Sequence, residues 1–203
     1  MIRVLFFGDA YLEHAGIVEI IKNKRTEWCV ENHAKSKSGQ SLIAATAYST
    51  YTRLKNSYPD DQYVCVVQET TRNIFTYHDP KTKQYMGMNL DNLEQHRKDF
   101  PHTKDLTKFG EKFLNDENLG TQFYASCFGL AEFFRCYDVP LLTFTAYDHE
   151  EKYRNDNPGL ENIAVMKEMY LKNREIFLNG AVKFGSTTDV ANELITHIER
   201  KLL

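Results

Sequence analysis

The chain has 203 residues, a length that suits one domain with a substantial core, and its 42% of apolar residues excludes a disordered protein. With a formal net charge of −3 and a pI near 6.2, it has no global field that would attract nucleic acid, so we expect no nucleic-acid partner. No apolar run reaches the roughly 20 residues that a membrane-spanning helix needs, and no signal peptide precedes Asp9, which together favour a cytoplasmic protein without a membrane span.

The first third of the chain alternates strand patterns with helix patterns. Strands are predicted over residues 2–7, 28–30 and 63–67, because these runs are apolar throughout, as in strands that are covered on both faces. Helices are predicted over 16–22 and from Ser41 to about residue 56, with Ser41 as the N-cap. This order favours a parallel sheet with right-handed crossovers.

The rest of the chain contains a long polar stretch followed by further strand and helix patterns. Residues 78–118 are polar and weakly periodic, and we interpret them as an insertion over the carboxyl end of the third strand, with short helices inside it. Further elements are predicted in this order: helix 120–137, strand 139–144, helix 161–178, a short strand 181–184 and a last helix capped by Thr187 or Thr188. We therefore predict a single α/β domain over 1–203, a three-layer α/β/α sandwich with a four- to five-stranded parallel, flavodoxin-like sheet and an insertion at about 78–118.

The cysteines give no sign of a disulfide framework or a metal site. Cys29, Cys65, Cys127 and Cys136 form no Cys-x-x-Cys pair, and no histidine stands at metal-site spacing from them. Cys29 and Cys65 fall inside apolar strand patterns, where a free thiol behaves as a small hydrophobic side chain. We expect reduced thiols in the core and no metal.

Short polar motifs follow each of the first three predicted strands: Gly8-Asp9-Ala10, Ser38-Gly39-Gln40 and Glu69-Thr70-Thr71-Arg72-Asn73. Because the carboxyl ends of parallel strands meet at one edge of a sheet, we expect these motifs to converge. The N–H groups of Ala10 and Gly39 and the amide of Asn73 would then surround one point near the Ala10 Cβ. Donors arranged in this way stabilise the oxyanion of acyl transfer.

The order of these motifs resembles the SGNH (GDSL-type) hydrolase family. In that family a Gly-Asp-Ser loop carries the nucleophile, a later Gly and Asn complete the oxyanion hole, and an Asp-x-x-His pair before the last helix supplies the base. Gly8-Asp9-Ala10 matches the first block except at the nucleophile, residues 32–41 look like the second, and residues 66–73 are similar to the third with its Gly-x-Asn-Asp rewritten. The likeness covers the whole chain in element order. It implies hydrolysis of an ester or acyl-type bond in a small-molecule or acylated substrate, with no cofactor.

Ala10 departs from this family pattern at the most important position. A methyl group cannot attack a carbonyl carbon, so serine chemistry fails at its first step in this chain. Two interpretations are open: Ala10 replaces a natural serine and silences the protein, or alanine is natural and the reaction is absent.

The expected base is also missing from its family position. Residues 181–189 contain no histidine, and we assign Asp189 to the first turn of the last helix, where its charge is favourable. Another histidine would have to serve: His149 in the loop after the fourth strand, His14 close after Ala10, or His78 in the insertion. Of these, His149 and His14 are the stronger candidates.

Two charged residues near these motifs are candidates for substrate binding. Arg72 follows a strand end, where its guanidinium could bind a carboxylate or phosphate, or equally pair with an acid of the insertion. Asp9 would either contact substrate or accept hydrogen bonds that hold the turn after the first strand.

Three other functions compete with the hydrolase. The absence of both the serine and the expected histidine favours a pseudoenzyme, in which the fold is kept as a binding or interaction module. Two acids, a hydroxyl and a lysine near the ends of successive strands are similar to the layout of a response-regulator receiver: Asp9, Glu69, Thr145 and Lys183. Such domains are far shorter, however, and use Asp rather than Glu as the phosphoacceptor. A nucleotide binder is the third, but no Gly-rich fingerprint supports it.

Overall fold

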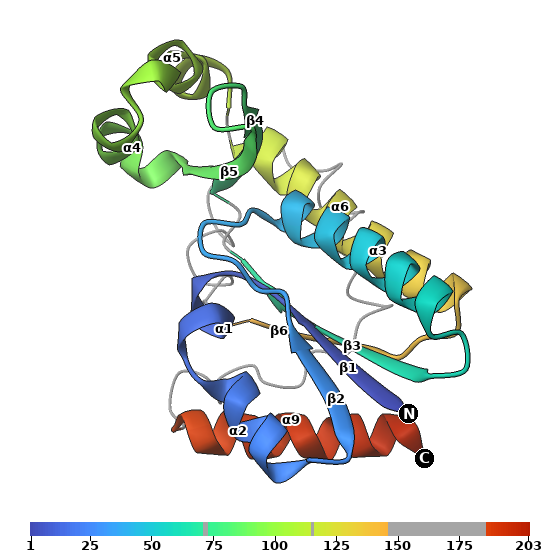
Figure 1. Ribbon diagram of the computed structural model, residues 1–203. Coiled ribbons are helices and arrows are strands. Elements are labelled where there is room, and N and C mark those ends of the chain that lie inside the picture. Colours follow the sequence, from blue (N-terminus) through green and yellow to red (C-terminus); the bar gives the residue numbers. More distant parts are fainter. Residues whose placement is uncertain (71–72, 115, 146–185) are drawn as a thin grey trace.

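A four-stranded parallel sheet in the order β2-β1-β3-β6 lies at the centre of the computed structural model (Figure 1). The structure describes residues 1–70, 73–114, 116–145 and 186–203. The strands are β1 (Ile2–Phe7), β2 (Trp28–Asn32), β3 (Gln62–Glu69) and β6 (Leu141–Thr145). The predicted parallel sheet is confirmed, whereas the helix expected over 161–178 and the strand expected over 181–184 fall outside the described residues.

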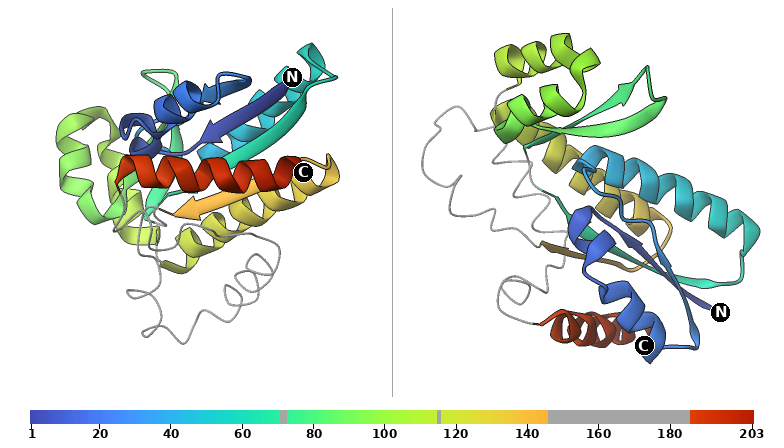
Figure 2. Two further views of the ribbon diagram at one scale, coloured as in Figure 1. Left: turned by 90° about the horizontal axis from the view of Figure 1, so that it is seen from below. Right: turned by 60° about the vertical axis from the view of Figure 1, so that its left-hand side comes forward.

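Helices cover both faces of this sheet, which confirms the three-layer α/β/α arrangement (Figure 2). One face carries α1 (Ala10–His14), α2 (Ile17–Lys24) and α9 (Thr187–Leu202), and the other carries α3 (Gln40–Ser57) and α6 (Asp116–Cys136). Successive strand side chains alternate between these layers: Val4 and Phe6 pack toward α2 and α9, and Leu5 and Phe7 toward α3 and α6. Strands buried on both faces explain why the predicted runs are apolar without alternation.

A hairpin and short helices extend beyond the carboxyl end of the sheet (Figure 1). This accessory unit, Ile74–Phe113, comprises β4 (Ile74–Asp79), β5 (Gln84–Asn89), η1 (Leu90–Asn92), α4 (Leu93–Asp99), η2 (Pro101–Thr103) and α5 (Lys104–Phe113). Its short helices agree with the prediction, but the hairpin was missed. Most of β4 and the first half of β5 are at least partly exposed, so their sequence has no apolar run to mark them.

Several predicted boundaries were wrong by a few residues. Helix α3 is capped by Gly39 rather than Ser41, and α9 by Ser186 rather than Thr187 or Thr188. The side chains of Ser186 and Asp189 form a reciprocal capping box, so Asp189 acts through hydrogen bonds as well as charge. Strand β3 continues past Val67 to Glu69 because its last residues, although polar, are paired with β6 and buried.

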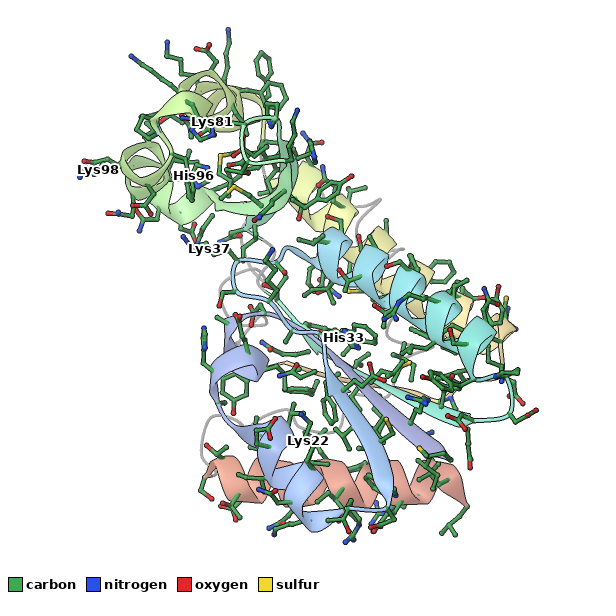
Figure 3. All side chains as sticks on the ribbon, viewed as in Figure 1. Lys22, His33, Lys37, Lys81, His96 and Lys98 are labelled. Carbon is green, nitrogen blue, oxygen red and sulfur yellow. The ribbon has the colours of Figure 1, made fainter. Side chains whose placement is uncertain are left out.

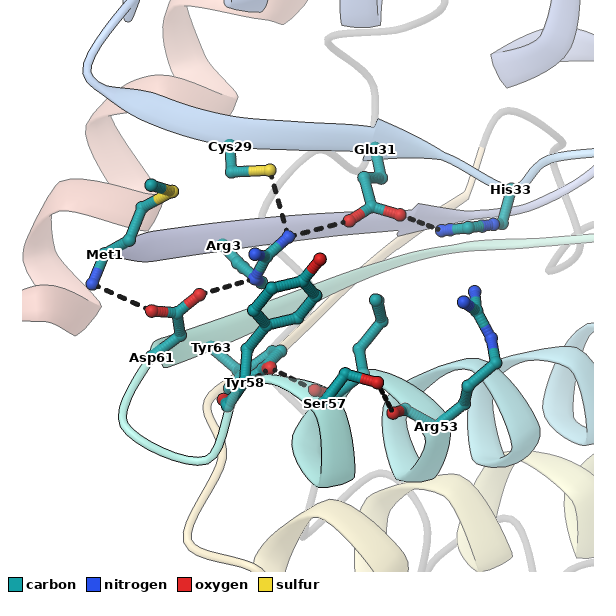
Figure 4. A network of polar contacts seen from close by, with 11 residues as sticks. Met1, Arg3, Cys29, Glu31, His33, Arg53, Ser57, Tyr58, Asp61 and Tyr63 are labelled. Carbon is teal, nitrogen blue, oxygen red and sulfur yellow. Dashed lines mark hydrogen bonds and ion pairs between the residues drawn. The ribbon is translucent and has the colours of Figure 1, made fainter.

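At the other end of β1, a buried arginine ties the strands together (Figure 4). Arg3 pairs with Asp61 at 2.6 Å and with Glu31 at 3.2 Å, and its guanidinium lies 3.8 Å from the centre of the Tyr58 ring. The amino group of Met1 also contacts Asp61, at 3.0 Å, and this hydrogen bond helps to lower the pKa of that carboxyl. These charges are engaged in joining β1 to its neighbours.

The cysteines are free thiols, and burial raises the pKa of Cys65 well above its usual value. Cys127 is also buried and Cys29 half-buried, but Cys136 is exposed at the end of α6, so the expectation that all lie in the core was wrong for Cys136. Within the described ranges, no helix is both long and apolar enough to cross a membrane.

Candidate active site

The turn after β1 depends on a glycine and a buried carboxylate. A Cβ at Gly8 would stand 2.8 Å from Gln68 Oε1 and 2.9 Å from Leu12 Cδ1, so only glycine allows β3 and α1 to approach this closely. Asp9 is 3% exposed and caps α1, its Oδ1 accepting from the N–H of Tyr11 at 3.1 Å. The apolar strand therefore stops abruptly, and Ala10 begins the helix.

Two side chains at the end of β3 hold the Asp9 carboxylate in place. Gln68 Nε2 donates to Asp9 Oδ1 at 2.7 Å, and the Thr70 hydroxyl donates to Oδ2 at 2.9 Å. Gln68 Oε1 in turn accepts from the N–H groups of Leu12, at 3.1 Å, and Asp9, at 3.4 Å. With both its oxygens used by the fold, Asp9 has the turn-holding role that was one of the two expected.

The start of α3 reaches the same place from the other face of the sheet. Gln40, 4% exposed, accepts a hydrogen bond from the Thr70 N–H through its Oε1 at 3.2 Å. A Cβ at Gly39 would stand 2.4 Å from Thr76 Oγ1 and 2.8 Å from the Ile74 carbonyl, so β4 packs directly on this turn. Thr70 thus joins Asp9 after β1 to Gln40 at the start of α3.

The loop after β2 completes this edge of the sheet. The N–H of His33 donates to the Phe6 carbonyl at 2.8 Å, and the N–H of Lys35 donates to the Gly8 carbonyl at 3.1 Å. The strand-end motifs that the sequence placed at one edge are therefore brought together by hydrogen bonds among the loops. Polar groups at the carboxyl ends of β1, β2 and β3 share one region beside Ala10.

Two of the predicted oxyanion donors are backbone groups that have no acceptor among the residues that the structure describes. Ala10 is half-buried at the first position of α1, and its N–H donates to no described residue. Gly39 has no side-chain cap and, in the described part of the chain, its N–H also has no acceptor. Such groups at a turn before a helix point outward and can bind an oxygen atom.

Asn73, the third predicted donor, uses its amide elsewhere. Its Nδ2 donates to Asp91 Oδ2 at 2.5 Å, and its carbonyl accepts from the Leu90 N–H at 2.9 Å. Asn73 therefore joins the start of β4 to η1. That it shares a point with Gly39 near the Ala10 Cβ stays a prediction.

Of the candidate histidines, the structure describes His14 and His78 but not His149, and His78 lies in β4 with its ring centroid 5.2 Å from that of Tyr85. His14 stands four residues after Ala10 on α1, which puts both on one side of the helix. Its Nε2 lies 2.9 Å from the Ser36 hydroxyl and 3.5 Å from the Glu13 carboxylate. Hydrogen bonds from the Ser36 hydroxyl and N–H lower the pKa of Glu13, which keeps a negative charge beside the ring. Arg72, like His149, is outside the described residues.

A pocket of about 240 Å³ opens beside this edge, and one histidine on its wall was overlooked in the sequence. His33 lines it together with Phe7, Lys35, Ser38 and Tyr85. The His33 ring stacks on Phe7 with centroids 5.4 Å apart, and its Nε2 lies 3.2 Å from Glu31 (Figure 3 labels His33). Burial lowers the pKa of His33 despite this carboxylate, so the ring favours its neutral form.

The residues that organise the edge include several that the sequence analysis did not single out: Gln40, Gln68 and Thr70. The signal for Gln68 and Thr70 was the polar run Gln68-Glu69-Thr70 directly after the apolar run that ends at Val67. Such polar side chains are buried only where they find hydrogen-bond partners, which here lie at the edge of the sheet. Of the receiver-like set, Asp9 lies just after β1 and Glu69 ends the neighbouring β3, but Lys183 lies outside the described residues. No cluster of metal-binding side chains occurs among the described residues.

Comparisons with known proteins give similar solved structures but no sequence relatives. No family model matches the chain, and no curated protein matches it. An esterase, EstA from Pseudoalteromonas sp., is 9% identical with a TM-score of 0.48, covering 98% of both chains. An acetyl xylan esterase is 10% identical (TM-score 0.49; 97% of this chain, 99% of that one), and TesA is 11% identical (0.49; 100% and 98%). At these identities, with TM-scores below 0.5, the likeness says nothing of a substrate.

Proposed function

We propose that the carboxyl edge of the sheet is the site of an SGNH-type hydrolase for an ester or acyl-type bond, with Ala10 at the position of the nucleophile. The observation that carries this proposal is the meeting of the loops after β1, β2 and β3 beside Ala10, with the N–H groups of Ala10 and Gly39 unengaged by described residues. The substrate would be a small molecule or an acylated compound, because the pocket beside the edge holds about 240 Å³.

The mechanism requires a hydroxyl at position 10. That oxygen attacks the carbonyl carbon while a histidine accepts its proton. His14 is the described candidate, with Glu13 positioned to stabilise the charged ring, and His149 is the alternative. The N–H groups of Ala10 and Gly39 hold the oxyanion, each worth about 3–4 kcal/mol if well aimed. The amide of Asn73, which also donates to Asp91, is a further candidate.

Ala10→Ser, which supplies the missing hydroxyl oxygen, tests the proposal. We expect Ala10→Ser to hydrolyse p-nitrophenyl acetate faster than the unchanged chain, and Ala10→Ser/His14→Ala to lose most of that gain. An Ala10→Ser variant that is folded but no faster than the unchanged chain would contradict a hydrolase site. Loss of the gain on changing His149 instead of His14 would reassign the base.

A second function is favoured by the methyl group of Ala10 itself. With no nucleophile, the edge can bind an acyl group but cannot turn it over. His14 is also mostly exposed, with 70% of its side chain accessible, which suits a surface residue better than a shielded base. If the serine variant stays inactive while the unchanged chain binds carboxylates, the protein is a binding module.

A further inference from the structure

Gln40 carries a buried donor that the fold does not use. Its Oε1 is engaged by the Thr70 N–H, which fixes the orientation of the amide and places Nε2 on the other side. That Nε2 is closed to water and has no hydrogen-bond partner, and among the described residues only Thr76 Oγ1 shares this condition. Both atoms belong to residues that flank Gly39. Buried polar groups are normally paired, so an unpaired one calls for an acceptor.

The start of α3, to which this amide belongs, carries backbone donors and no acidic side chain. Gln40 is the first residue of α3, a helix of 18 residues. Its N-terminus carries the positive end of the helix dipole, and Gly39 offers no side-chain cap. The unpaired Nε2 of Gln40 thus belongs to the residue that begins α3, and the N–H of the preceding Gly39 also has no acceptor among the described residues. An anionic or carbonyl oxygen is the partner that such donors favour.

We propose that Gln40 Nε2 donates a hydrogen bond to an oxygen of the bound carboxylate or acyl group, next to the N–H of Gly39. This inference rests on the proposed function, because the ligand is the acyl group of that site. Thr70 hydrogen-bonds both Gln40 and Asp9, so the amide is held beside the residue that precedes Ala10. Gln40, rather than Asn73 with its amide on Asp91, is then the side-chain donor of the site.

Titration with acetate, followed by NMR of the side-chain amide of Gln40, tests the proposal on the unchanged chain. Gln40→Glu is the sharpest variant, since it keeps an oxygen for the Thr70 N–H and replaces the unpaired NH₂ by a second oxygen. We expect the Gln40 amide resonances to shift with acetate and Gln40→Glu to weaken acetate binding by about tenfold or more. Gln122→Glu, the same change on an exposed position of α6, should alter it by less than about twofold.

The proposal is overturned if acetate leaves the Gln40 resonances unmoved, if the unchanged chain binds no acetate, or if Gln40→Glu binds it equally well. A large loss in Asn73→Ala alone would transfer the role to Asn73. Failure of the hydrolase is separable: an inactive Ala10→Ser variant with Gln40-dependent acetate binding refutes turnover only. An active Ala10→Ser variant whose acetate affinity is unchanged by Gln40→Glu would refute only the role of Gln40 as a hydrogen-bond donor.

Discussion

Asp9 precedes the nucleophile position, yet its carboxylate is occupied by the fold. It accepts from the Tyr11 N–H, Gln68 and Thr70 while almost fully buried. Asp9→Asn puts an NH₂ group against at least one of these donors, and we expect it to lower the free energy of unfolding by about 1–3 kcal/mol. Urea denaturation measures this. Asp60→Asn, the same change on an exposed turn, should stay within about 0.5 kcal/mol, and an equal effect of both would contradict the role of Asp9.

A second buried carboxylate makes the accessory unit sensitive to acid. Burial by itself would raise the pKa of Asp79, but hydrogen bonds from the Lys81 N–H, His102 and the Thr82 hydroxyl outweigh it and lower the pKa to about 2. Because this value is below the 3.8 of an unfolded chain, the ionised form stabilises the fold above pH 4. The contribution is lost as the pH falls from about 4 to about 2.

Asp79→Asn should remove this pH dependence. We expect the difference in melting temperature between the unchanged chain and Asp79→Asn to be constant above pH 4.5 and to shrink toward pH 2, since protonation makes the two side chains alike. Thermal melts at half-unit pH steps measure it. A difference that does not change with pH would mean that the charge of Asp79 contributes nothing.

Single-residue roles were only partly accessible from the sequence. The turn-holding role of Asp9 could be argued from its place after an apolar strand. The assignment of Ala10 to the nucleophile position could be argued from its place directly after Asp9. The role of Gln40 could not be predicted, because it depends on a hydrogen bond from the N–H of Thr70, 30 positions later, to the amide oxygen of Gln40. Long-range hydrogen bonds of this kind leave no periodic pattern in the sequence.

Among the elements, the packing of β4 on the start of α3 is the contact that matters most for the site. A methyl group at Gly39 would clash with Thr76 Oγ1 and the Ile74 carbonyl. We expect Gly39→Ala to destabilise the protein by about 1–3 kcal/mol, the usual cost of overpacking. Gly39→Ala/Thr76→Ala should recover part of this, because it removes the hydroxyl but leaves the carbonyl. Additive losses in denaturant unfolding would show that the two positions do not touch.

The elements themselves were predicted where burial produces a pattern. Strands β1, β2, β3 and β6 are apolar because helices cover both faces, and their existence was clear from the sequence. The β4–β5 hairpin was not clear from the sequence, because most of β4 and the first half of β5 are at least partly exposed and so produce no apolar run. The caps were displaced by one or two residues because Gly39 and Ser186 compete with neighbours of similar propensity.

For the whole molecule, sheet order decides where chemistry can occur. The strand order 2-1-3 places the carboxyl ends of β2, β1 and β3 side by side, and the accessory unit stands at that same end (Figure 1). The alternation of strands and helices predicted a parallel sheet with its strand-end loops at one edge, but the strand order comes from the structure. The sequence could not predict that the accessory unit touches the α3 turn, because that contact joins segments with no shared pattern.

The most direct measurement is labelling of Ala10→Ser with a fluorophosphonate, followed by mapping of the adduct. The unchanged chain is the matched control, and unfolding curves should show the two proteins within about 0.5 kcal/mol, as for a small change at the half-buried first position of α1. We predict one phosphonyl group on the introduced serine and none on the unchanged chain. A folded serine variant that stays unlabelled, or is labelled elsewhere, would contradict an oxyanion site beside the tenth residue.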